Sequence, residues 1–346
     1  MTPLGMTQFS YIKEIVKSGL ENDQEKFKEA LNELIEHAKK TKKINYALQL
    51  QSLLKDAIRQ EQSRGPKLVG SHSYFTHLED RELNEFVLEK VTSEYRFENL
   101  IVNEDVKEQL QFLIDEHRSK ELIQKFNLPI SNKVLLYGPS GCGKTLASYV
   151  IAGELEKMMY VINLGAIVSS KLGETSKNLA KVFRQATTED CIIFIDEFDS
   201  LGKVRDYAQD HGEMKRIVNT ILQLFDYLPQ NSIVIAATNQ IEMIDTALLR
   251  RFDVKLKLEL PDKNKIKKLI ELVLKNGNFS FDKKNAISTI LKYAEGLSYY
   301  MIQKALIGAI KRSILDKNFA NNQSAVRIST SVWLDIIKQE KEKITN

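Results

Sequence analysis

The residues best suited to chemistry begin with the run GPSGCGKT at positions 138–145. Its glycines allow backbone N–H groups to surround an anion without side-chain clashes. Lys144 can reach the outer phosphates of a nucleotide, and the Thr145 hydroxyl can bind Mg²⁺. An apolar run precedes this loop and a helical pattern follows it, which is the context of a phosphate-binding P-loop. The residues expected to surround the phosphates are Pro139, Ser140, Gly141, Cys142, Gly143, Lys144, Thr145 and Leu146.

A second group of candidate residues is an acidic pair that ends the apolar run Cys191–Ile195. The run is typical of a buried parallel strand. Asp196 is suited to hold Mg²⁺ together with Thr145, and Glu197 to orient or deprotonate an attacking water. Taken alone, the pair could equally be an acidic loop after a core strand; the P-loop favours the catalytic interpretation.

Further polar residues follow the apolar run Ile233–Ala237. Asn239 at the tip of this predicted strand could hydrogen-bond an attacking water or a γ-phosphate. The adjacent Arg250 and Arg251 indicate anion recognition through charge-assisted hydrogen bonds. A solvated helix end is the alternative for these arginines.

The elements that must position these residues alternate between strands and helices. Alternation of this kind predicts an α/β fold, with a parallel sheet covered by helices on both faces. Ligands of such sheets bind at the carboxyl ends of the strands, where the P-loop is expected. The predicted strands are Val134–Tyr137, Tyr160–Asn163, Cys191–Ile195, Ile233–Ala237 and Val254–Leu258.

Shifts in pattern divide the chain into four parts. Residues 1–65 show three short amphipathic helical patterns and are expected to form a small bundle. Residues 66–93 are polar and mixed, and are expected to be a linker. The α/β domain is expected at 94–261, and an all-α lid over the bound nucleotide at 262–346.

Composition narrows the class of protein. The net charge of +4, from 50 Lys+Arg and 46 Asp+Glu, is too small to indicate a nucleic-acid partner. Cys142 and Cys191 fall at P-loop or core positions, which predicts no disulfide and fits a reducing cytoplasm. The sequence shows neither an apolar run of about 18 residues nor a signal-peptide pattern. His72 and His77 are expected to be solvated loop residues rather than metal ligands.

Residues 95–315 resemble the AAA clade of the AAA+ ATPases, because GPSGCGKT, CIIFIDE, the Thr-Asn after the next strand and DTALLRRFD occur in that order. The resemblance implies Mg²⁺-dependent ATP hydrolysis in rings, expected to be hexamers, that remodel or deliver a protein. It implies that Asn239 senses the γ-phosphate and that Arg250 and Arg251 act on a neighbouring subunit. It also implies that Ile101 and Val102 contact the adenine.

One position departs from that clade. The stretch SSKLGE at 169–174 resembles the first pore loop, but Lys171 stands where an aromatic residue is usual. An aromatic grip on a threaded polypeptide is therefore not expected from this loop. The short N-terminal helices and the compact RRF motif resemble small bacterial AAA ATPases encoded beside subtilisin-like serine proteases and linked to phage defence. That narrower resemblance implies such a protease as partner.

Other functions remain as alternatives. A DNA-associated loader of the AAA+ type would bind mixed-sequence DNA in a salt-dependent way. A scaffold that only switches its assembly with nucleotide would show no turnover that depends on Glu197. A small-molecule kinase would leave Asn239 and the arginine pair without a role.

Overall fold

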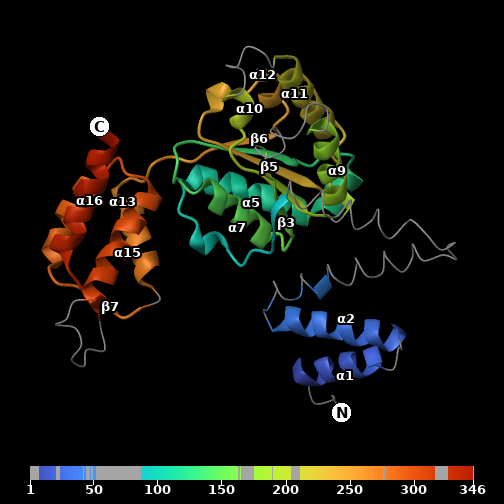
Figure 1. The fold of residues 1–346 in the computed structure, drawn as a ribbon, viewed down its shortest axis with the longest axis horizontal. Coiled ribbons are helices and arrows are strands. Elements are labelled where there is room, and N and C mark those ends of the chain that lie inside the picture. Colours follow the sequence, from blue (N-terminus) through green and yellow to red (C-terminus); the bar gives the residue numbers. More distant parts are fainter. Residues whose placement is uncertain are drawn as a thin grey trace.

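The computed structural model describes residues 8–20, 24–41, 43, 47, 50–51, 87–162, 164, 175–188, 190–203, 211–275, 277–315 and 326–345 (Figure 1). Lys171, with the loop around it, lies outside these residues. So do His72, His77, and most of the third predicted N-terminal helix and of the predicted linker.

The centre of the molecule is a sheet of six strands in the order β1-β3-β4-β5-β2-β6. All neighbouring strands run parallel except β1 and β3. The five strands predicted from sequence are present, each within one residue of its expected ends. The strand that precedes Asn239, β5, lies between the acidic strand and the P-loop strand. The strands are β1 (Val87–Val91), β2 (Lys133–Tyr137), β3 (Met159–Ile162), β4 (Ile192–Ile195), β5 (Ile233–Thr238) and β6 (Val254–Lys257).

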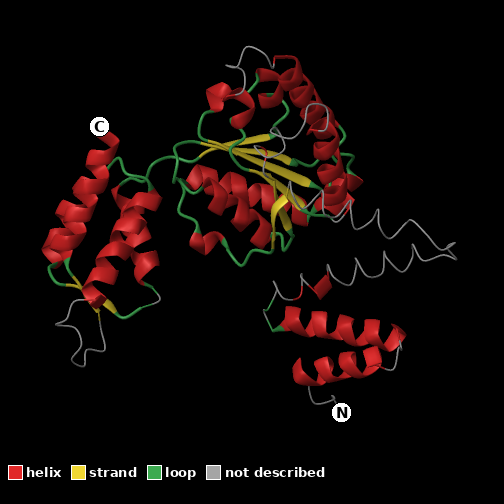
Figure 2. Ribbon diagram, viewed as in Figure 1, coloured by secondary structure: helices red, strands yellow, loops and turns green. Residues whose placement is uncertain are grey.

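Helices cover both faces of this sheet (Figure 2). Successive residues of β2 enter different cores: Leu135 joins α9 and α11, whereas Val134 and Leu136 join α5 and α7. Alternation of this kind makes a strand apolar throughout, because both of its faces are buried. The helices of this domain are α5 (Glu104–Arg118), α6 (Lys120–Lys125), α7 (Lys144–Glu154), α9 (Thr175–Thr188), α10 (Ser200–Lys203), α11 (His211–Asp226) and α12 (Thr246–Leu249), with short 3₁₀ turns at Phe97–Asn99 and Ile241–Met243.

The predicted linker at 66–93 is wrong at its carboxyl end. Val87–Val91 forms strand β1, which pairs antiparallel with β3 at the edge of the sheet. The Lys90 ammonium lies 4.6 Å from the centre of the Tyr160 ring. Charged side chains are common on edge strands because they discourage pairing with another chain, and here the exposed Glu89 and Lys90 hid the strand pattern. The α/β domain therefore includes residues before 94.

The lid also differs from its prediction, because it is not all-α. Phe279–Phe281 (β7) and Val326–Ile328 (β8) form a parallel two-stranded sheet. The lid core contains Trp333, which is fully buried and stacks on Phe281 with ring centres 5.5 Å apart. Strands of three residues are too short to show a periodic pattern. The lid helices are α13 (Lys263–Leu274), α14 (Ile287–Ala294), α15 (Tyr299–Leu315) and α16 (Thr330–Thr345), with a 3₁₀ turn at Lys284–Ala286.

The N-terminal region contains α1 (Gln8–Leu20) and α2 (Gln24–Lys40), which pack side by side. A small cluster of Ile35, Ala38 and Ala47 is buried here. Among the helices that the structure describes, none is long and apolar enough to cross a membrane.

Candidate functional site

The P-loop leaves the sheet beside the tip of β5. Tyr137 pairs with Thr238, so Gly138 and Asn239 emerge at the same level of neighbouring strands. Gly138 has φ +135°, and a Cβ there would lie 2.1 Å from the Leu258 carbonyl oxygen. A side chain at this position is therefore excluded, and the loop must begin with glycine.

Lys144 is the first residue of α7, and its side chain reaches back to the start of the loop. Its side chain is buried, and Nζ donates hydrogen bonds to the carbonyl oxygens of Gly138 at 2.7 Å and Pro139 at 2.9 Å. A third bond, of 2.7 Å, reaches the Asn239 Oδ1 atom. Burial lowers the pKa of this ammonium below its usual value. A buried cation held only by neutral oxygens can bind an anion strongly, because its present partners do not neutralise its charge.

The acidic pair lies on the other side of the loop. Thr145 Oγ1 donates a hydrogen bond of 3.2 Å to Asp196 Oδ2. The fold thus brings together two oxygen atoms from residues that are far apart in sequence. A hydroxyl oxygen and a carboxylate oxygen are both suitable ligands for Mg²⁺. Glu197 has φ +49°, a left-handed conformation that is uncommon outside glycine, and its side chain is exposed. This turn directs Glu197 into the same cavity as Lys144.

A buried interaction joins the tips of β4 and β5. The Thr238 hydroxyl donates to Asp199 Oδ1 at 3.0 Å, and the Phe198 N–H donates to the Ala237 carbonyl at 2.8 Å. Asp199 is 1% exposed. These bonds hold the turn after β4 against β5, the strand that presents Asn239. Glu197, the candidate base, and Asn239, the candidate γ-phosphate sensor, are therefore positioned together. The sequence reasoning gave Asp199 no role of its own, although this residue lies two positions after Glu197.

These residues surround a cavity of about 570 Å³ between the α/β domain and the lid. Most of the predicted site residues line it, including Glu197, Asn239 and Ile101. Val102 packs against the α/β core instead, and Pro139 contributes its carbonyl to Lys144. The lining residues that the sequence reasoning missed are Tyr95, Asn99, Leu100, Leu269, Leu272, Val273, Tyr299, Tyr300 and Gln303.

The lid touches the P-loop directly. The Tyr300 N–H donates to the Gly141 carbonyl at 3.2 Å. Gly141 has φ +73°, and a Cβ on it would lie 2.6 Å from Ser298 Oγ. Ser298 and Tyr300, at the start of α15, thus lie against the P-loop. A change in lid position would therefore move the wall of the cavity.

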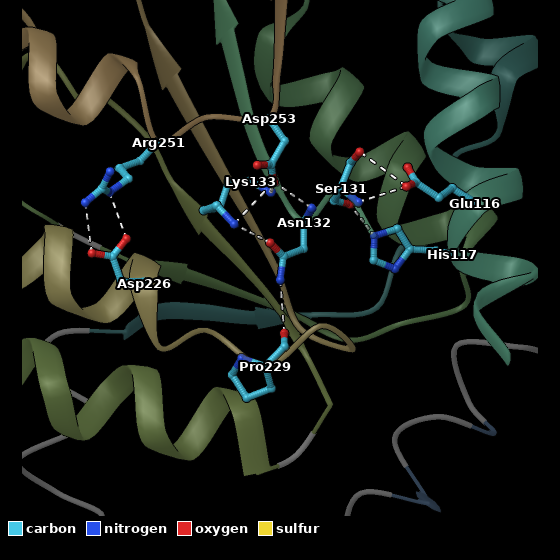
Figure 3. A network of polar contacts seen from close by, with 9 residues as sticks. All are labelled: Glu116, His117, Ser131, Asn132, Lys133, Asp226, Pro229, Arg251 and Asp253. Carbon is cyan, nitrogen blue, oxygen red and sulfur yellow. Dashed lines mark hydrogen bonds and ion pairs between the residues drawn. The ribbon is translucent and has the colours of Figure 1, made fainter. Parts of the chain in front are cut away.

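The two arginines lie away from this cavity. Arg251 forms a two-point ion pair with Asp226, with Nε–Oδ1 at 2.7 Å and Nη2–Oδ2 at 3.0 Å (Figure 3). Asp253 follows at the start of β6, where it accepts from the N–H groups of Asn132 and Lys133 at 2.9 Å each. Asn132 and Lys133 lie at the amino end of β2, whereas the P-loop follows its carboxyl end.

The length of β2 therefore separates Arg250 and Arg251 from the P-loop of the same chain. Four residue steps of a strand span roughly 13 Å. Both arginines are exposed, and neither lines the nucleotide cavity. Within one chain, the cavity combines a cation, two carboxylates and an amide around a glycine-rich loop, which suits transfer of a phosphoryl group to water.

Comparisons with known proteins agree with this chemistry. Residues 134–260 match the family described as "ATPase family associated with various cellular activities (AAA)". An uncharacterized AAA family ATPase of Sinorhizobium fredii is 33% identical over 230 residues, which are 66% of this chain and 68% of that protein. A putative 26S proteasome regulatory subunit homolog of Methanocaldococcus jannaschii is 28% identical over 66% of this chain and 62% of its own length.

The similarity extends to larger proteins. An ATP-dependent zinc metalloprotease FtsH 2 of Sphaerobacter thermophilus is 33% identical over 181 residues, which are 51% of this chain but 28% of that protein. The matched region is thus only part of the length of such relatives.

Proposed function

Because the chain belongs to the AAA family of ATPases, we propose that it hydrolyses ATP in a ring of identical subunits and uses the energy to remodel or deliver a protein. The observation that carries this proposal is the single cavity lined by Lys144, Glu197 and Asn239. A relative named as a proteasome regulatory subunit homolog supports a protein as substrate.

Each residue of the cavity has a distinct role in this proposal. Lys144 binds the outer phosphates and releases Asn239, whose amide then contacts the γ-phosphate or the attacking water. Glu197 accepts the proton of that water. Thr145 and Asp196 would hold Mg²⁺, which neutralises charge on the phosphates when bound.

The position of the arginines supports the proposed ring. Arg250 and Arg251 lie at the amino edge of the sheet, away from the P-loop of their own chain, so in this proposal they act at the site of another subunit. Arginines supplied in this way accelerate phosphoryl transfer by about 10³ to 10⁵. A hexamer is the ring size that the family resemblance implies.

Two variants test the assignment of the cavity. Lys144→Ala should abolish ATP binding, because it removes the phosphate-binding cation. Glu197→Gln should bind ATP without turning it over, because the pocket remains and the base is lost. Binding by calorimetry and phosphate release by a coupled assay separate these outcomes, and near-normal hydrolysis in both variants would refute the site.

A mixing experiment tests the shared site. Arg251→Ala and Glu197→Gln should each turn over ATP slowly. In mixed rings, a subunit with Arg251→Ala keeps its own Glu197 and receives Arg251 from its neighbour, so turnover should recover. If subunits exchange and mixing restores nothing, the arginine does not act between subunits.

The identity of the partner protein is the most specific part of this proposal. The compact RRF motif supports a subtilisin-like serine protease as the protein delivered or activated, in phage defence. Capture with Glu197→Gln held in ATP, followed by mass spectrometry, tests this. Recovery of other proteins without any protease would contradict it and leave the ATPase assignment intact.

A further inference from the structure

A buried hydroxyl stands directly before the candidate sensor Asn239. Thr238 is the last residue of β5 and is 1% exposed. Its Oγ1 donates a hydrogen bond of 3.0 Å to Asp199 Oδ1 and accepts one of 3.0 Å from the Gln240 N–H. A single hydroxyl thus joins the residue after Asn239 to the turn that follows β4. Neither Thr238 nor Asp199 lines the nucleotide cavity, so the roles proposed above use neither of them.

The position of Asn239 depends on its backbone. All six residues of β5 are buried, whereas Asn239 is exposed. Its Oδ1 accepts the bond of 2.7 Å from Lys144, and in the proposed function Lys144 turns to the phosphates when ATP binds. The amide must then keep its place without this partner. A threonine hydroxyl that bonds to the N–H two residues later forms a local turn, and here that turn spans Asn239.

Asp199 fixes the direction of the Thr238 hydroxyl. A hydroxyl can rotate, and it can both donate and accept hydrogen bonds. An ionised carboxylate only accepts, so the Thr238 hydrogen points to Asp199 and a lone pair remains for the Gln240 N–H. Charge-assisted bonds of this kind are roughly twice as strong as neutral ones. The two bonds therefore hold the backbone on both sides of Asn239 in one arrangement.

Asp199 also belongs to the turn that carries the candidate base. Glu197 has the left-handed φ of +49°, and its carbonyl accepts from the Ser200 N–H at 2.8 Å. The Phe198 N–H donates to the Ala237 carbonyl on β5 at 2.8 Å. One backbone bond at Phe198 and one side-chain bond at Asp199 thus fasten this turn to β5. The support of Asn239 is therefore anchored in the same turn as Glu197.

We propose that Thr238 and Asp199 are positioning residues for ATP hydrolysis. The Thr238 hydroxyl, oriented by Asp199, holds the backbone around Asn239 so that its amide meets the γ-phosphate or the attacking water beside Glu197. This inference rests on the proposed ATPase function and adds two residues to it. Neither residue contacts ATP, so their loss should slow hydrolysis without weakening nucleotide binding.

The main test is Thr238→Val, which keeps the shape of the side chain and removes its hydroxyl. The kcat for ATP should fall roughly tenfold to a hundredfold, the value of one hydrogen bond to a charged group. The Kd for ATP, measured by calorimetry, should not change. Thr238→Ser restores a hydroxyl and should recover most of the lost rate. In an Asn239→Ala background, Thr238→Val should lower kcat no further, because the side chain that it positions is absent.

The lid supplies a matched control. Thr330 is 2% exposed, and its Oγ1 donates to Asp282 Oδ1 at 2.6 Å. This pair repeats the buried threonine–aspartate bond, but Thr330 does not line the nucleotide cavity. Thr330→Val should lower Tm, as Thr238→Val does, and leave kcat unchanged. A general loss of stability would act on kcat in both variants, so the contrast between them isolates positioning.

Asp199→Asn tests the same contact from its other end. The asparagine Oδ1 can still accept from Thr238, but the bond is no longer charge-assisted. The kcat should therefore fall less than in Thr238→Val, and again not at all in the Asn239→Ala background. If Thr238→Val does not fold, this variant decides the question, and an undiminished kcat in Asp199→Asn overturns the proposal.

The possible failures have different signatures. A folded Thr238→Val with wild-type kcat overturns the positioning role and leaves the ATPase assignment in place. Equal losses of kcat with and without Asn239, or a weaker Kd for ATP, also overturn it, because Thr238 would then act on the fold or on binding. A wild-type chain without ATP turnover that depends on Glu197 overturns the proposed function, and this inference with it.

Discussion

The pair of Asp226 and Arg251 should matter for turnover and little for stability. Both side chains are about half exposed, at 47% and 46%. Exposed ion pairs contribute about 0.2–1 kcal/mol. Asp226→Asn keeps the shape of the side chain and removes its charge, so the free energy of unfolding should fall by less than about 1 kcal/mol, a change of a few degrees in Tm.

The expected effect on kcat is larger. Asp226 engages Nε and Nη2 of Arg251, which leaves Nη1 outside the pair and able to meet a phosphate of the neighbouring subunit. Without Asp226 to hold it, the Arg251 side chain regains rotamer freedom worth about 2 kcal/mol. This freedom must be lost again each time the arginine contacts the transition state. That loss corresponds to roughly a thirtyfold decrease in kcat. The KM for ATP should change little, because the P-loop is intact.

Steady-state kinetics of four proteins check this prediction: wild type, Asp226→Asn, Arg251→Ala and the double variant. If Asp226 acts through Arg251, its substitution should have no further effect once Arg251 is absent. Glu36→Gln is the control, since it breaks the exposed Lys39–Glu36 pair on α2. Full kcat in Asp226→Asn, or equal losses with and without Arg251, would refute the reasoning.

Three further outcomes can be measured. Gly141→Ala should weaken ATP binding about tenfold or more by calorimetry, because a left-handed alanine costs about 1–2 kcal/mol and its Cβ would displace Ser298; an unchanged Kd would contradict this. Burial lowers the pKa of His117, so the unfolded chain takes up its proton first as pH falls, and stability in urea should decrease below about pH 6.5. That decrease should be smaller in His117→Gln. A chain starting at residue 84 should keep ATP turnover, whereas one starting at 94 should melt lower because β1 is lost.

The sequence alone determined the α/β fold and the core of the candidate site. A buried strand, a glycine-rich loop and a following helix are encoded by neighbouring residues, so the P-loop could be placed without any long-range contact. The acidic pair was found for the same reason, because its position after an apolar run puts it at the carboxyl edge of the sheet. The ends of β3, β4 and β5 were accurate to one residue because these strands are buried throughout and therefore continuously apolar.

Only the tertiary structure decided which distant residues meet. Lys144 and Asn239 are 95 residues apart, and their hydrogen bond depends on β5 lying next to β2. The pairing of Arg251 with Asp226 and the lid residues of the cavity arise in the same way from packing. Strand β1 and the β7–β8 pair also escaped prediction, because short or charged strands owe their pairing to a neighbouring strand rather than to their own pattern. Local periodicity encodes elements, whereas packing between elements brings the functional groups together.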